Sequence, residues 1–167
     1  MSRSDDEDVL GLTIKHAIQS HWKARDYAGL IRIYRSHPLM PDPRSRLRCS
    51  IAFGRLGRWD ECVECLSVGL EQQPEPALYY ERSLARLEQG CWDEAIGDTE
   101  LCLLESERLN STFYASSALA VRCVAFYHLG DRGGFGRAAD GLDRRANVWA
   151  RGRLYTIDEM ELALGNQ

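Results

Sequence analysis

A short motif that returns 33 residues later constrains the fold of this chain more than any other feature. Residues 57–62 (GRWDEC) are echoed by residues 90–95 (GCWDEA). At both places a helical pattern ends at the glycine, a turn follows, and the tryptophan with its two acidic neighbours opens a second helical pattern that closes on Leu70 or Leu103. Two helices in each unit of about 34 residues are the signature of a helical-hairpin solenoid. The echo therefore predicts an all-α, antiparallel helix-hairpin solenoid.

The order of small and large residues around the first copy of the motif resembles the repeat pattern of the tetratricopeptide repeat family. In such a hairpin, small residues stand where two helices approach closely, and large residues fill the opposite gap. Ser50, Cys62 and Gly69 occupy the small positions here, and Phe53 and Trp59 occupy large ones. The resemblance implies a right-handed superhelix of stacked hairpins, with Trp59 and its counterpart Trp92 buried between helices.

The second copy of the motif matches the same family with two departures. The matching positions are Tyr79, Ser83, Trp92, Ala95 and Cys102. Arg86 stands where the family has a large apolar residue, and Glu105-Ser106 replaces the closing proline that Pro74 supplies in the first copy. The resemblance is clearest over residues 43–106.

Weaker copies of the repeat flank this stretch. One is centred on Asp26-Tyr27 and one on Gly130-Asp131, with a helix expected from Thr112 to Leu129 and another from about Gly134 to Arg145. The array then spans residues 9–145 with about four hairpins. It follows an acidic amino-terminal tail at residues 1–8.

Residues 146–167 carry no repeat pattern and read as a loop and a capping helix. Thr156 and Glu159 have the spacing of a capping box, which satisfies free amides at a helix start. Ile157, Met160, Leu162 and Leu164 follow on the same helix. Because a solenoid must cover its last apolar face, we expect this helix to close the array, and we expect no strand anywhere.

Composition excludes several classes of protein. No apolar stretch approaches the roughly 20 residues of a membrane span, and residues 1–8 are acidic, unlike the start of a signal peptide. We therefore expect a cytoplasmic protein without a membrane partner. The net charge of −4 disfavours nucleic-acid binding, despite an arginine-rich first third of the chain.

The six cysteines predict structural thiols rather than a metal or redox site. Cys62 and Cys65 have the spacing of a metal knuckle, but no second pair accompanies them. Acidic neighbours would also raise a thiol pKa rather than lower it. Cys62, Cys102 and Cys123 occupy small packing positions. The glycine-rich residues 130–136 lack the Gly-Lys-Ser/Thr ending of a phosphate loop. We expect no metal, no cofactor and no catalytic residues.

Charge is distributed in three blocks. Residues 9–58 hold ten basic and two acidic groups, residues 59–107 hold two and thirteen, and residues 108–153 hold eight and three. If the hairpins stack in the order of the chain, each block of charge lies beside a block of the opposite sign. The pattern is explained either by complementarity between neighbouring repeats or by a polarised surface that steers a charged partner.

The resemblance also implies where a partner binds. Members of the family bind peptides in a concave groove lined by the first helix of each repeat. The corresponding residues here are Lys15, Gln19, Arg44, Leu47, Arg48, Ile51, Arg55, Tyr80, Glu81, Leu84 and Val124. Basic residues gather at the amino-terminal end of this set, and apolar residues form a stripe. The stripe is either helix packing or a seat for an apolar anchor.

The chain departs from the family members that clamp a carboxyl terminus on heat-shock chaperones. Lys15 matches their pattern, but Gln19, Arg48 and Glu81 do not. We therefore predict an adaptor, scaffold or chaperone-like module that binds a partner segment with acidic and apolar residues. The alternative is an assembly subunit that docks or self-associates through its convex face or its ends.

Overall fold

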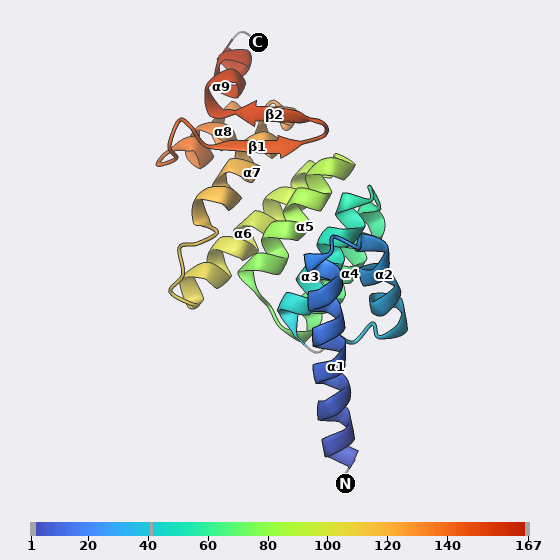
Figure 1. Ribbon diagram of the computed structural model, residues 1–167. Helices are drawn as coiled ribbons and strands as arrows, with labels where there is room; N and C mark the ends of the chain where they lie inside the picture. Colours follow the sequence, from blue (N-terminus) through green and yellow to red (C-terminus); the bar gives the residue numbers. More distant parts are fainter. Residues whose placement is uncertain (1–2, 41, 166–167) are drawn as a thin grey trace. The chain divides into compact units, whose positions relative to one another are not determined.

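The computed structural model describes residues 3–40 and 42–165, and over these residues the chain is mostly helical (Figure 1). It divides into two compact units, an N-terminal unit of residues 1–73 and a C-terminal unit of residues 74–167. The boundary falls between the second and third predicted repeats, so that each unit holds two of the expected helix pairs.

The described residues of the N-terminal unit form four helices. They are α1 (Arg3–Lys23), α2 (Tyr27–Ser36), α3 (Pro43–Arg55) and α4 (Trp59–Gln72). Each packs on the next, and α1 also packs on α3. Because α1 begins at Arg3, the acidic residues 5–8 belong to its first turns. Ile18, Leu30, Cys49, Phe53 and Leu66 are completely or almost completely buried in this unit.

Aspartate caps begin two of these helices. The Asp26 carboxylate accepts a hydrogen bond from the Gly29 amide at 2.8 Å, and the Asp42 carboxylate accepts one from the Ser45 amide at 2.9 Å. A capping carboxylate satisfies an amide that has no partner within the helix. Pro43 follows Asp42 at the first helical position, where its missing N–H costs nothing.

A left-handed residue stands two positions before the second helix of every hairpin. Its φ is +69° at Gly57, +78° at Gly90 and +70° at Gly130. These values confirm that the repeat glycines turn the chain between helices. In the first hairpin the same place is taken by Arg25, with φ of +54°. A side chain there is strained, since only glycine adopts this conformation readily.

The C-terminal unit adds a small sheet to its helices. Its elements are α5 (Pro76–Gln89), α6 (Trp92–Arg108), α7 (Ala115–Leu129), α8 (Arg132–Ala139), β1 (Asn147–Ala150), β2 (Arg153–Thr156) and α9 (Ile157–Gly165). Helix α7 is central to this unit, because α5, α6, α8, α9 and β1 all contact it (Figure 1). The core includes Leu87, Val121, Val124, Ile157 and Met160.

The prediction that the chain has no strand is wrong. Strands β1 and β2 pair as an antiparallel hairpin, with Val148 opposite Tyr155 and Trp149 opposite Leu154. Arg151 and Gly152 have φ of +51° and +75°, so they form a two-residue turn with both central residues left-handed. This turn type matches the twist of paired strands.

Two helix boundaries also differ from the prediction. Helix α7 begins at Ala115 rather than Thr112, and α8 ends at Ala139 rather than near Arg145. The early end of α8 follows from Asp140 and Gly141, which leave the helical conformation; Gly141 has φ of +86°.

The terminal helix begins where the capping box places it. The Glu159 amide donates to the Thr156 hydroxyl at 3.4 Å, and α9 starts at Ile157. Met160 and Leu164 are buried in the core of the C-terminal unit, whereas Leu162 is 68% exposed. Helix α9 therefore covers apolar surface of this unit, as a capping helix should.

The repeat tryptophans are half-buried rather than buried. Trp59 lies against Gly54, where an added Cβ would come within 2.8 Å of its ring. Trp92 stacks on the His128 ring at 4.1 Å between centroids. The expected burial of Cys62, Cys102 and Cys123 is confirmed.

Candidate functional site

The predicted binding residues of the N-terminal unit lie on α1 and α3, two helices that pack together. Lys15 and Gln19 come from α1. Arg44, Leu47, Arg48, Ile51 and Arg55 come from α3. We call these seven residues the basic face. Its lysine and two of its arginines, Arg44 and Arg55, are exposed, while the apolar members are half-buried.

Two members of the basic face already have partners within the unit. The Lys15 ammonium lies 3.5 Å from a carboxylate oxygen of Asp42. Burial opposes ionisation of Asp42, but hydrogen bonds from Ser45 and the charge of Lys15 together hold its pKa below the usual range. The Arg48 guanidinium lies over the Trp22 ring at 5.9 Å. Arg44 and Arg55 are therefore the members best placed to meet a partner.

The predicted residues of the C-terminal unit are divided between its surface and its core. Tyr80, Glu81 and Leu84 lie on α5 and are half-buried; Tyr80 and Leu84 pack against the core cluster. Val124 is completely buried. The assignment of Val124 to a groove is therefore corrected: its place on the inner side of α7 makes it a core residue.

The structure gathers an aromatic patch at the junction of α5 and α7. It consists of Tyr80, Phe113 and Tyr114. The Tyr80 and Tyr114 rings lie 5.4 Å apart, and the Phe113 and Tyr114 rings meet edge to face at 4.9 Å. Phe113 is 79% exposed, the largest fraction among the exposed large apolar side chains. An aromatic ring exposed to this degree beside a second ring is a surface feature of the kind enriched at protein interfaces.

Sequence reasoning missed Phe113 and Tyr114 because both lie in the interruption between the third and fourth repeats. That interruption has no helical periodicity, so no face could be assigned to it. Two adjacent aromatic residues in a turn were the available signal.

A carboxylate borders the aromatic patch. Burial first, and then the charge of Glu81, raise the pKa of both Tyr80 and Tyr114 above the ordinary value of 10.0. Both phenols are therefore neutral near pH 7 and keep a hydroxyl that can donate a hydrogen bond.

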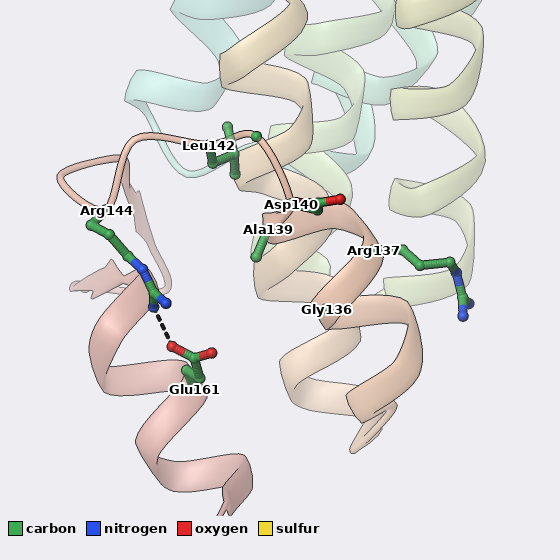
Figure 2. Close-up of a pocket in the computed structure, with 8 residues that line it drawn as sticks. Gly136, Arg137, Ala139, Asp140, Leu142, Arg144 and Glu161 are labelled. Carbon is green, nitrogen blue, oxygen red and sulfur yellow. Dashed lines mark hydrogen bonds and ion pairs between the residues drawn. The ribbon is translucent and has the colours of Figure 1, made fainter.

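A hollow of about 530 Å³ lies between α8 and α9 in the same unit (Figure 2). Its polar lining residues are Arg137, Asp140, Arg144 and Glu161. Figure 2 shows Arg144 reaching toward Glu161 while Arg137 points away from this pair. Arg144 also lies 3.2 Å from Asp158, so its charge is already neutralised. An ion pair between Arg144 and Glu161 thus bridges the hollow.

A smaller hollow of about 210 Å³ in the N-terminal unit is lined by a buried arginine. Arg46 is 1% exposed and donates to the carbonyl oxygens of Pro38 at 3.0 Å and Cys65 at 3.2 Å, and to the Gln72 side chain at 2.9 Å. These bonds tie the start of α3 to α4 and to the chain before it. Arg46 therefore has a structural role in this unit.

Residues 3–40 and 42–165 hold no group of three histidine, cysteine or acidic side chains arranged to bind a metal ion. Within the same ranges, no helix combines the length and the apolar character needed to cross a membrane.

The aromatic patch and the basic face are thus the two surfaces on which a functional proposal can be built. No related protein indicates a role for either surface. The chain matches no model of a known protein family and no curated protein sequence.

Proposed function

We propose that this chain is a helical-hairpin repeat protein, similar to the tetratricopeptide repeats, that binds a segment of a partner protein without catalysis. Three features support it: paired helices, a left-handed residue at each hairpin turn, and first helices that pack on one another within each unit, α1 on α3 and α5 on α7. Free buried thiols suit a reducing compartment such as the cytoplasm.

The exposed aromatic patch is the observation that carries the proposal. Interface hot spots are enriched in aromatic side chains, which bury a large area at a small cost in conformational entropy. Phe113 offers a ring to the partner, and the neutral phenols of Tyr80 and Tyr114 offer hydrogen bonds beside it. This combination suits an apolar anchor residue on a partner segment.

The basic face is a separate surface, on the N-terminal unit, that would act on the charge of a partner. Exposed arginines such as Arg44 and Arg55 attract acidic residues over the screening length and so raise the rate of encounter. We therefore propose a partner that carries acidic residues, which the basic face attracts, and a segment with at least one large apolar residue, which the aromatic patch binds.

The proposal is tested with a displayed library of random peptides. Peptides are selected on the wild-type chain and counted again on the double variant Tyr80→Ala/Phe113→Ala. We expect the selected peptides to share an apolar anchor, and to bind the double variant at least 10-fold more weakly, a loss of about 1.4 kcal/mol.

A matched control separates the patch from general hydrophobicity. Leu162→Ala removes another well-exposed apolar side chain, on α9. Peptides that bind the wild type, the double variant and Leu162→Ala equally well would place recognition elsewhere and defeat the proposal.

A further inference from the structure

The aromatic patch combines rings with negative charge. Glu81 directly follows Tyr80 on α5, and Glu75 stands at the amino-terminal cap position of the same helix. Both acidic residues are half-buried, as are Tyr80 and Tyr114. The two tyrosine rings lie 5.4 Å apart and tilt against each other by 39°. A partner that touches these rings therefore also meets carboxylates.

The charges of the two carboxylates act on the phenol groups. Burial and then the charge of Glu81 raise the pKa of both Tyr80 and Tyr114, and the charge of Glu75 adds to the effect at Tyr114. A carboxylate that disfavours a second negative charge favours a positive charge at the same place. The surroundings of the two rings therefore suit a cation.

Negative charge also predominates along α5 and α6. Residues 75–108 hold nine acidic and three basic side chains. All three arginines already pair with carboxylates, two of them with the buried Asp98. Since carboxylates remain in excess, the field of this hairpin attracts positively charged groups.

We infer that the aromatic patch selects a partner segment in which a lysine or arginine stands next to the apolar anchor. The anchor packs on Phe113, and the charged group of the basic residue lies against the Tyr80 and Tyr114 rings, beside Glu81. The electrons of an aromatic ring attract a cation, and the aliphatic stem of a basic side chain packs on apolar surface. The inference rests on the proposed binding of a segment by the patch and names the residue type that the patch recognises.

A wholly apolar segment suits this surface less well. Any segment that covers Tyr80 and Tyr114 also removes water from the half-buried Glu81. Removing water from a carboxylate costs free energy, which a nearby opposite charge offsets. An acidic residue at the same place would be repelled. The rings and the carboxylate thus favour the same occupant.

The peptides selected on the wild-type chain test the inference. Among those that lose binding to Tyr80→Ala/Phe113→Ala, we expect a lysine or arginine beside the apolar anchor. In one such peptide the basic residue is replaced by a neutral analogue of similar length, norleucine for lysine or citrulline for arginine. Calorimetry should show that this replacement weakens binding to the wild type by about 10-fold.

The variant Glu81→Gln tests the carboxylate at constant side-chain size. It should bind the basic peptide about 5-fold more weakly, the upper end for a charge pair partly open to solvent, and it should discriminate less between the basic and the neutral peptide.

Glu94→Gln is the matched control. Glu94 is exposed at the start of α6, where its carbonyl oxygen accepts a hydrogen bond from Arg86. The start of α5 lies further along α6, since the Cys102 thiol donates to the Pro76 carbonyl oxygen at 3.3 Å. The control therefore removes a carboxylate from the other end of the hairpin and should bind both peptides as the wild type does.

The outcomes separate this inference from the proposed function. Peptides that need the aromatic patch but bind equally well with and without their basic residue, or that carry none, would overturn the inference alone. Glu81→Gln that binds both peptides as the wild type does would also overturn it. Selection of no patch-dependent peptide would defeat the proposed function and the inference together. Melting temperatures establish that both variants are folded, and the peptide replacement decides the matter without a variant if Glu81→Gln unfolds.

Discussion

At the scale of single residues, burial decides the chemistry of the thiols. Cys49, Cys62, Cys65, Cys102 and Cys123 are buried, and Cys91 alone is partly accessible. Burial raises the pKa of Cys49 and Cys123 to about 12 and that of Cys65 and Cys102 to about 11. A thiol reacts as its thiolate. Reagents therefore react slowly with these thiols for two reasons: the sulfur atoms are buried, and they stay protonated near neutral pH.

Thiol labelling of the native protein should therefore be biphasic. With a thiol reagent near pH 8, about one equivalent should react rapidly, and the others should react only as the protein unfolds. Cys91→Ser should abolish the rapid phase, while Cys102→Ser should leave it unchanged. Rapid reaction of more than one thiol in the native protein would contradict the packing described for the cysteines.

His128 makes stability depend on pH. Its ring stacks on Trp92 and lies 2.9 Å from the Tyr155 hydroxyl. Burial first, and then the charges of Arg151 and Arg153, lower its pKa below the ordinary value of 6.5. The folded state therefore favours the neutral ring. The resulting stability is present above the unfolded pKa and is lost as pH falls through the folded pKa.

The comparison that isolates this effect is between the wild type and His128→Gln. We expect the melting temperature of the wild type to exceed that of His128→Gln at about pH 7.5, and this difference to shrink progressively as the pH is lowered from about 7.5 to about 5. Differential scanning calorimetry at several pH values measures it. A difference in melting temperature that does not vary with pH would show that His128 does not titrate in this way.

At the scale of helices and turns, the left-handed residues set the hairpins. A Cβ added at Gly57 meets no atom within 4 Å, so Gly57→Ala isolates the cost of a positive φ. We expect that variant to lose about 1 kcal/mol of unfolding free energy. Arg25→Gly should gain up to about 1 kcal/mol for the same reason, since Arg25 has φ of +54°.

Chemical denaturation measures both changes, with Gly97→Ala as the control. Gly97 lies within α6 with open space around it, and there alanine should stabilise by up to about 1 kcal/mol through helix propensity. Destabilisation at Gly97 as large as that at Gly57 would mean that φ does not explain the glycine positions.

The α5–α6 hairpin is held by a buried ion cluster. Asp98 is 1% exposed and receives hydrogen bonds from Arg82 at 2.6 to 3.1 Å and an ion pair from Arg86 at 2.8 Å. Arg86 replaces the large apolar residue that the repeat pattern predicts, and this carboxylate explains its presence. Removing one member of such a cluster leaves buried charge without compensation.

Asp98→Ala should therefore cost about 3 to 5 kcal/mol of unfolding free energy. Arg86→Met should cost less, because Arg82 still neutralises the carboxylate and methionine suits the repeat position. Urea unfolding of both variants and of the double variant gives the coupling. An Asp98→Ala loss below about 1 kcal/mol would show that the cluster contributes as little as an exposed pair.

The same scale shows what the sequence could and could not predict. The two middle helix pairs were predictable because a glycine followed two residues later by a tryptophan marks each of their turns, 33 residues apart. The hairpin of β1 and β2 was not, because its strands have only four residues each and its turn is Arg151-Gly152 rather than Asn-Gly. Val124 was misplaced because α7 is apolar on most of its surface, so its pattern does not distinguish the buried side.

At the scale of the whole molecule, the chain combines two helical units with different surfaces. The N-terminal unit presents basic side chains on α3, and the C-terminal unit presents the aromatic patch between α5 and α7. The basic face could be predicted because charge is read directly from sequence. The patch could not, since Phe113 and Tyr114 meet Tyr80 only after the chain folds.

Titration of the full chain with one selected peptide tests the central claim, that the aromatic patch binds a partner segment. Calorimetry would compare the wild type, Phe113→Ala and Leu162→Ala, after melting temperatures show that all three are folded. Loss of a hot-spot ring costs about 2 kcal/mol, so Phe113→Ala should weaken binding by roughly 30-fold, while Leu162→Ala should not change it. Equal affinity of the wild type and Phe113→Ala would contradict the account.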